Sequence, residues 1–292
     1  MERRTMTGHL AAVLTAVLWG TTFISTKILL VDFNPVEILF IRFIMGYVAL
    51  SLVAGKRIPF TGWRGELPFI AAGISGITLY YLFENMALTY TMASNVGVVV
   101  SAAPLFTAIL IHLVYKEEKF QPSFLAGFVV SMAGICLISF NGSRLELNPI
   151  GDFLSVAAAV LWAFYSVFTR KISGYGYSTV VMTRRIFFYG ILLMIPALPF
   201  FDCKLGIGRF ANPVYVFNLI FLGIGASALC FVTWNYAVRV LGAVKTSVYI
   251  YMVPVITVVT SMIVLHEKIT PLAAAGTVCT LTGLILSEWK YK

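Results

Sequence analysis

The chain has 292 residues, of which 60% are hydrophobic and only 11% are charged, and its mean hydropathy is +0.92. Soluble proteins have about 25% charged residues, so this chain lacks the polar surface that water requires. The composition predicts an integral membrane protein and excludes disordered, disulfide-rich secreted and nucleic-acid-binding proteins. The net charge of +9 fits a membrane protein, because cytoplasmic loops of such proteins are rich in Lys and Arg.

Ten apolar segments are long enough to cross a bilayer as helices, each of which takes about 20 residues. Their apolar runs are continuous rather than alternating, which predicts helices and not a β-barrel. Polar turns with Pro and Asn separate several of them. In chain order the expected spans are 8–30, 35–54, 67–87, 94–115, 122–140, 151–171, 178–200, 213–236, 245–265 and 271–289.

Most Lys and Arg residues in the loops and at the ends of these spans fall on the side of the N-terminus, among them Arg3, Arg4, Arg170 and Lys171. Positively charged loops stay in the cytoplasm. We therefore expect both termini to be cytoplasmic, in a multi-pass protein of the cell (inner) membrane.

The two halves of the chain resemble each other. An AVLW run ends at Trp19 in the first half and at Trp162 in the second, and Arg42 matches Arg185. Further matches pair Asn85 with Asn235, Pro104 with Pro254, Glu117 with Glu267, Gly127 with Gly276 and Gly134 with Gly283. Residues 1–143 and 144–292 thus form two five-helix repeats. Five is odd, so the second repeat is inverted, an arrangement typical of secondary transporters with a midplane site.

The two copies of one motif resemble the EamA-type module. The segments VVVSAAPLFTAILIHLVYKEEKFQPSFLAGFVVSMAGICLI and VYIYMVPVITVVTSMIVLHEKITPLAAAGTVCTLTGLIL each combine a mid-helix Pro, a closing acidic residue and a Gly-rich helix. The chain is therefore similar to bacterial EamA-type members of the drug/metabolite transporter superfamily. That resemblance implies a 5+5 inverted bundle around a central cavity, and it does not fix the substrate.

The charged residues within the expected spans include three candidates for a functional role: Arg42, Glu84 and Arg185. A charge at the bilayer centre costs about 3 kcal/mol, so each needs a partner, water or a substrate. The alternatives are substrate contact or gating ion pairs on one side, and snorkelling or structural pairing on the other.

Polar and aromatic residues in the spans complete the candidate cavity. An Asn in hydrocarbon faces the bundle interior, where it binds substrate or ties helices together. Aromatic rings with polar tips suit amphipathic organic solutes, although core packing explains any single ring equally well. The candidate substrate-binding residues are Trp19, Arg42, Tyr80, Glu84, Asn85, Trp162, Tyr165, Arg185 and Tyr249.

Two prolines and four glycines have expected mechanical roles. Pro104 and Pro254 each remove a helix hydrogen bond, so they are candidate hinges, with a static kink as the alternative. Small residues allow close helix packing. The glycines of the fifth and tenth spans, expected to pack against each other, are Gly127, Gly134, Gly276 and Gly283.

The leading interpretation is a secondary transporter, an exporter of small amino acids or related metabolites by alternating access. Arg42 or Arg185 would bind a carboxylate and Glu84 an ammonium group. The alternative is efflux of organic cations; an integral membrane enzyme is less well supported, because the chain has no HExxH or GxSxG motif. We expect no cofactor or metal, a small-molecule substrate and the lipid bilayer as partners, no nucleic acid, and a functional monomer.

Overall fold

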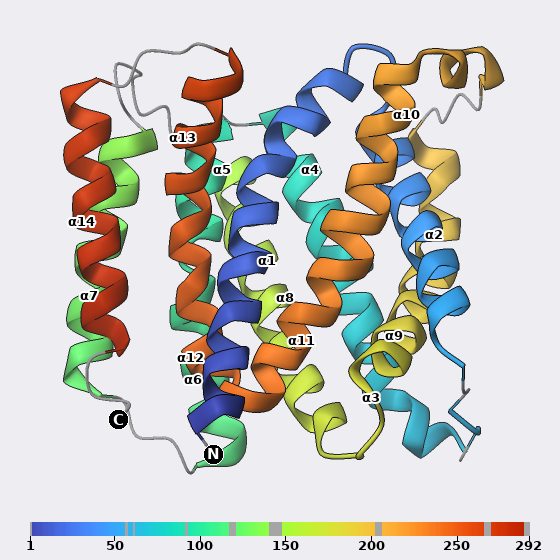
Figure 1. Cartoon of the computed structure of the whole chain (residues 1–292), viewed down its shortest axis with the longest axis horizontal. Helices are drawn as coiled ribbons and strands as arrows, with labels where there is room; N and C mark the ends of the chain where they lie inside the picture. The colour runs from blue at the N-terminus through green and yellow to red at the C-terminus, as the bar shows by residue number, and fades with distance from the viewer. Residues whose placement is uncertain are drawn as a thin grey trace.

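The computed structural model describes residues 2–55, 58–60, 62–90, 93–116, 121–139, 148–201, 206–265 and 270–288. Every element within these ranges is helical, and the helices stand side by side in one bundle (Figure 1). The first half contributes α1 (Glu2–Leu29), α2 (Pro35–Val53), α3 (Trp63–Gly73), η1 (Ile74–Leu79), α4 (Tyr80–Tyr90), α5 (Ala93–Val100), α6 (Ala103–Tyr115) and α7 (Pro122–Ser139). The second contributes α8 (Pro149–Ser173), α9 (Thr179–Met194), η2 (Ile195–Phe201), η3 (Ile207–Ala211), α10 (Pro213–Ile220), η4 (Phe221–Leu229), α11 (Cys230–Leu241), α12 (Ala243–Ser247), η5 (Val248–Tyr251), α13 (Met252–Leu265) and α14 (Pro271–Glu288).

Three helices begin at Asn-Pro pairs, as the sequence predicts. The side chains of Asn34, Asn148 and Asn212 accept hydrogen bonds from backbone N–H groups of the first turns of α2, α8 and α10. The proline that follows each of them has a fixed φ suited to the first helical position and no N–H group to satisfy. In α2, Glu37 completes a capping box by accepting from the backbone N–H of Asn34 at 2.8 Å.

Two of the long helices change to π-helix near their middle. The helix over 63–90 has this geometry in η1, and the helix over 213–241 has it in η4. Short π segments interrupt helices mostly at functional positions. The two interruptions occupy positions that the sequence repeat matches, because each is followed about two turns later by its matched Asn, Asn85 or Asn235.

The two prolines expected at hinges lie beside breaks in the α-helical geometry. Pro104 is in the first turn of α6, directly after a turn at Ser101–Ala102 that separates α6 from α5. Pro254 is in the first turn of α13, directly after the 3-10 segment η5. A proline cannot donate to the carbonyl four residues earlier and its ring collides with it, which accounts for both breaks.

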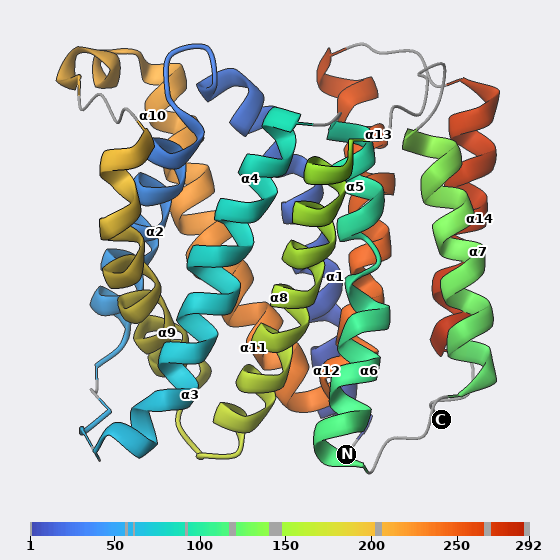
Figure 2. The same cartoon turned by 180° about the vertical axis from the view of Figure 1, so that it is seen from behind.

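The helices α7 and α14 pack against each other at one end of the long axis, which is visible from both sides (Figure 2). The four glycines of these helices lie in their contact. A Cβ atom at Gly127 would lie 2.5 Å from the carbonyl oxygen of Gly283, and one at Gly134 would lie 2.5 Å from that of Gly276. The backbones approach so closely that no side chain fits between them.

Eight helical stretches in the described residues are long and apolar enough to cross a membrane, and α14 is apolar but shorter. The eight include the helices over 63–90 and 213–241 with their π segments. Helix α9 is not among the eight, because its regular helix has only 16 residues and includes Arg184 and Arg185. Helix α1 begins and α14 ends at the same, lower end of the bundle in Figure 1.

Replacing Gly134 by Ala should destabilise the protein by about 1–3 kcal/mol, the usual cost of overpacking, because the new Cβ would collide with the backbone of α14. The matched control is Gly97→Ala in α5, where a Cβ meets nothing within 4 Å and Ala favours the helix. Thermal unfolding in detergent measures both variants. Equal midpoints for the two would contradict the glycine contact.

Candidate functional site

An aromatic cluster fills the middle of the bundle. Trp19 of α1 meets Trp162 of α8 with ring centroids 5.4 Å apart and Trp234 of α11 at 5.1 Å. Trp162 in turn meets Tyr80 of α4 and Tyr165 of its own helix, both at 5.1 Å. Four of the residues predicted to bind substrate are therefore neighbours, contributed by both halves of the chain.

Two indole N–H groups in this cluster have no hydrogen-bond acceptor. Trp162 and Trp234 are buried, and their Nε1 atoms are without a partner, whereas Nε1 of Trp19 donates to the carbonyl of Ala226 at 3.1 Å. A buried donor left unpaired costs about 1–3 kcal/mol. Such donors can hydrogen-bond a polar group of a ligand.

Arg42 lies beside the aromatic cluster with its charge unpaired. Its side chain is buried, its Nε donates to Oγ of Ser227 at 2.8 Å, and its guanidinium carbon lies 5.5 Å from the ring centre of Tyr81. Tyr81 packs against both Tyr80 and Phe43. Among the described residues no carboxylate lies within ion-pair distance of Arg42.

Glu84 faces the same region from α4. Its Oε1 accepts a hydrogen bond from the hydroxyl of Tyr80 at 3.1 Å, and it interacts electrostatically with Arg42. Glu84 and Asn85 are both part-exposed, as is Tyr80. A cationic and an anionic group thus border the aromatic cluster without being paired to each other.

Asn235 ties three helices together. Its Oδ1 accepts from the hydroxyl of Tyr165 in α8 at 2.8 Å, and its Nδ2 donates to Oγ1 of Thr183 in α9 at 3.0 Å. All three side chains are fully buried. Tyr165 is a predicted substrate contact, and its hydroxyl donates its hydrogen bond to Asn235.

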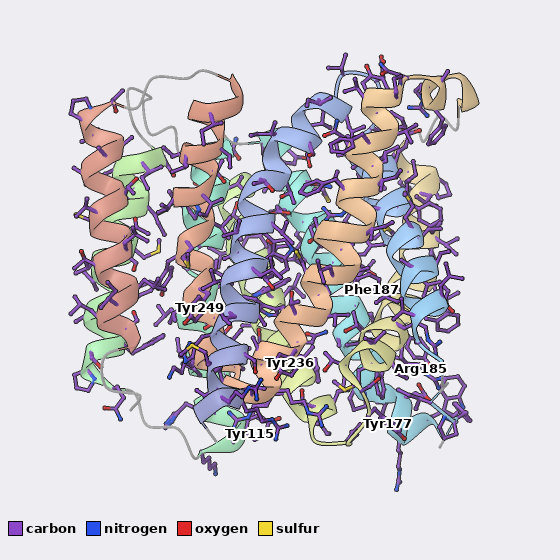
Figure 3. The ribbon with its side chains drawn as sticks, in the orientation of Figure 1. Tyr115, Tyr177, Arg185, Phe187, Tyr236 and Tyr249 are labelled. Carbon is purple, nitrogen blue, oxygen red and sulfur yellow. The ribbon has the colours of Figure 1, made fainter. Side chains whose placement is uncertain are left out.

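Arg185 does not join the aromatic cluster. Its guanidinium forms a two-point ion pair with Glu66 of α3 and also donates to the carbonyl of Ile58 at 3.0 Å. Tyr189 donates to the same carboxylate at 2.8 Å. Figure 3 shows Arg185 in the lower part of the bundle.

A small pocket of about 310 Å³ adjoins this ion pair. It is lined by Ile58, Gly65, Glu66, Phe69, Tyr175 and Tyr177. The pocket lies at the end of the bundle where α1 begins, and Tyr177 marks it in Figure 3. None of the residues predicted to bind substrate lines it.

Tyr249 is also apart from the cluster. Its hydroxyl lies 2.6 Å from Nδ1 of His9, so it connects η5 to the first part of α1. Tyr236 makes a similar contact nearby, with its hydroxyl 2.9 Å from that of Thr7. Both tyrosines lie in the lower half of the bundle in Figure 3.

Sequence reasoning missed several members of the site. Ser227, Phe231 and Trp234 come from η4 and α11, and Phe43 and Phe187 are fully buried rings beside them. The signals for Trp234 were its aromatic ring within the eighth expected span and its place one residue before the repeat-matched Asn235. Ser227 carried no signal, because a serine between small residues in an apolar helix is ordinary.

No three His, Cys, Asp or Glu side chains in the described parts of the chain gather as a metal site would require. Glu117 and Glu267, the closing acids of the repeated motif, lie outside the described residues.

The apolar helices and the buried charged and aromatic centre define a multi-pass helical membrane protein. The model of the EamA-like transporter family matches residues 6–140 and again residues 149–289. The chain belongs to this family, which is one of transporters rather than enzymes.

Full-length relatives carry transporter names. The chain is 32% identical to an uncharacterized transporter of Archaeoglobus fulgidus over 97% of each protein. It is 26% identical to a probable terminal-alkyne amino-acid exporter of Streptantibioticus cattleyicolor, covering 94% of this chain and 91% of that protein. It is 24% identical to a probable amino-acid metabolite efflux pump of Escherichia coli, covering 94% and 93%.

A solved crystal structure shares the fold. It superposes with a TM-score of 0.78 over 99% of this chain and 97% of its own, at 21% sequence identity.

Arg185→Gln should lower the thermal midpoint, because it leaves the buried carboxylate of Glu66 without its cationic partner at a cost of about 1–3 kcal/mol. The double variant Glu66→Gln/Arg185→Gln should recover part of the loss. Thermal unfolding of the wild type, both single variants and the double variant measures this. Additive losses would show that the two side chains do not stabilise each other.

Proposed function

We propose that this protein is a secondary transporter that exports small amino acids or related metabolites. The observation that carries the proposal is the buried Arg42, whose charge no described carboxylate neutralises. A buried cation without a counterion is strongly unfavourable. A substrate carboxylate bound to the terminal nitrogens of Arg42 would remove that cost during transport.

The groups around Arg42 complement the rest of an amino acid. Glu84 offers a carboxylate to an ammonium group, and it is part-exposed although its neighbours are interior residues. Trp19, Trp162 and Tyr80 offer aromatic surface to an apolar side chain, with the indole N–H of Trp162 as a donor. Arg185 and Tyr249, both engaged elsewhere, are not part of this proposed site. The names of two relatives, an amino-acid exporter and an amino-acid metabolite efflux pump, point the same way.

Alternating access follows if the two halves are inverted five-helix repeats, residues 1–143 and 144–292, that give ten membrane helices around a central cavity. Three observations support the repeats: the two family-model matches, the π segments η1 and η4, and the helix breaks before Pro104 and Pro254. In this proposal the two breaks are hinges, while the glycine contact of α7 with α14 stays closed. The protein would then work as a monomer without a cofactor.

The proposed orientation puts both termini in the cytoplasm, at the inner membrane of the cell. It is supported by the shared end at which α1 begins and α14 ends, and by the exposed Arg3, Arg4 and Lys171 at helix ends. In a chain whose four native cysteines are replaced by serine, a cysteine introduced at Met6, which is 60% exposed, should react with a membrane-impermeant thiol reagent only after the membrane is opened. Labelling of intact spheroplasts would contradict this orientation.

Efflux of organic cations is the second candidate. Glu84 next to the rings of Tyr80 and Tyr81 is the observation that favours it, because carboxylates and aromatic faces both attract cations. It leaves the unpaired charge of Arg42 unexplained, and this is why we prefer an amino-acid substrate.

Arg42→Gln should raise the apparent KM for an exported amino acid at least about tenfold, the loss expected for a charged hydrogen-bonded contact. The measurement is uptake of a panel of labelled amino acids and organic cations by proteoliposomes, with protein-free liposomes as the blank. The matched control is Lys171→Gln, an exposed cation at the end of α8. Unchanged amino-acid transport by Arg42→Gln, or accumulation equal to the blank by the wild type, would contradict the proposal.

A further inference from the structure

We propose that Ser227 is the specificity-determining residue of this site, because its uncharged side chain positions Arg42 and leaves the arginine charge available to a substrate anion. This inference rests on the proposed function and adds a residue that selects the charge of the substrate. It predicts that an acid at position 227 changes the preference from carboxylates to cations.

The contact between the two residues is direct and closed to solvent. Nε of Arg42 donates to Oγ of Ser227 at 2.8 Å, and Ser227 is fully buried. A hydrogen bond at Nε leaves the two terminal nitrogens, which together carry four N–H donors, for a ligand. These two nitrogens can together bind a carboxylate at two points, as those of Arg209 bind Glu37.

The helix that carries Ser227 is packed tightly against α2. A Cβ atom at Gly46 of α2 would lie 3.1 Å from the carbonyl oxygen of Gly223 and 3.3 Å from Cβ of Ser227. Ser227 lies within the π segment η4. This close packing against α2, the helix that also carries Arg42, sets where the serine hydroxyl meets the guanidinium.

The matched arginine of the second half shows the opposite arrangement. Arg185 meets the carboxylate of Glu66 through two nitrogens, and Arg209 likewise meets Glu37 at 2.9 and 3.2 Å. Arg42 meets a hydroxyl instead. Of the three charged side chains that are buried in the described chain, Glu37 and Glu66 are paired and Arg42 is not.

None of the other described groups that face Arg42 forms an ion pair with it. The ring centres of Phe43 and Tyr81 lie 5.5 Å from its guanidinium carbon. The Glu84 carboxylate accepts a hydrogen bond from Tyr80 and lies beyond ion-pair distance of Arg42. An aspartate at 227 would be at the position of the serine hydroxyl. It would then be a permanent internal anion for Arg42, as Glu66 is for Arg185.

The decisive comparison is Ser227→Asp against Ser227→Asn, since these two side chains have nearly the same size and differ in charge. Proteoliposome uptake is measured with leucine and with leucinamide, which keeps the ammonium group and lacks the carboxylate. We expect the Asn variant to retain the wild-type preference for leucine. The Asp variant should lose leucine transport at least about tenfold, the expected value of a charged hydrogen-bonded contact, and should prefer leucinamide.

Three results would overturn the inference. Equal losses in the Asp and Asn variants would show that space and not charge matters at position 227. Leucine transport at the wild-type rate in the Asp variant would show that an anion at position 227 does not compete with the substrate for Arg42. A wild type that transports organic cations and no amino acid would overturn both this inference and the proposed function, whereas the first two results leave the proposed function intact.

A further variant keeps the inference testable if the Asp chain does not fold. Ser227→Ala removes the hydroxyl and should raise the KM for leucine severalfold with little change in kcat, because Arg42 is no longer held in place. The matched control is Ser155→Ala. Ser155 is buried in α8, and its hydroxyl donates a hydrogen bond to the carbonyl of Gly151 in the same helix. A Ser227→Ala chain that unfolds at the control's temperature and keeps the wild-type KM would overturn the role of Ser227.

Discussion

The central constraint on this molecule is the cost of burying a charge inside the helical bundle. Glu37 and Glu66 satisfy it with arginines that reach them at opposite ends of the bundle, and each arginine also bonds a backbone carbonyl. Arg42 satisfies it only in part, with a hydroxyl and aromatic faces. Glu37 and Glu66 each have a charged partner, and Arg42 has none among the described residues. A buried cation without a counterion is unfavourable. We propose that this difference separates the structural charges from the one that binds substrate.

The two helix crossings next to these charges resemble each other. Where α2 crosses η4, Gly46 approaches Gly223, and where α9 crosses η1, Gly190 approaches Gly73. In both, a helix of one half lies against the π segment of the other, and small residues permit the contact. The two crossings are fixed by backbone packing, so they position the side chains of η1 and η4 firmly. The breaks before Pro104 and Pro254 lie in other helices, where the proline removes a regular helix hydrogen bond.

Local signals in the sequence predicted much of the fold. The Asn-Pro pairs, expected as turns between spans, lie at the starts of α2, α8 and α10, because an Asn cap and a first-turn proline act within a few residues of each other. The π segments η1 and η4 were not predicted, since this geometry depends on neighbouring helices rather than on a residue pattern. For the site, the repeat drew attention to Trp19 and Trp162, and the structure places them in contact. The repeat drew equal attention to Arg42 and Arg185. The structure gives them different partners, since Arg185 pairs with the carboxylate of Glu66 and Arg42 with the hydroxyl of Ser227.

The sequence by itself determined that this chain is helical and belongs in a membrane, because apolar composition and continuous hydrophobic runs leave no other solvent for it. It also determined that the chain contains matched residues in its two halves. Only the tertiary structure decided which partner each matched residue meets: Ser227 for Arg42, Glu66 for Arg185, and Tyr165 with Thr183 for Asn235. These partners lie on helices more than fifty residues away in the chain, so their identity depends on how the helices pack and not on any local pattern.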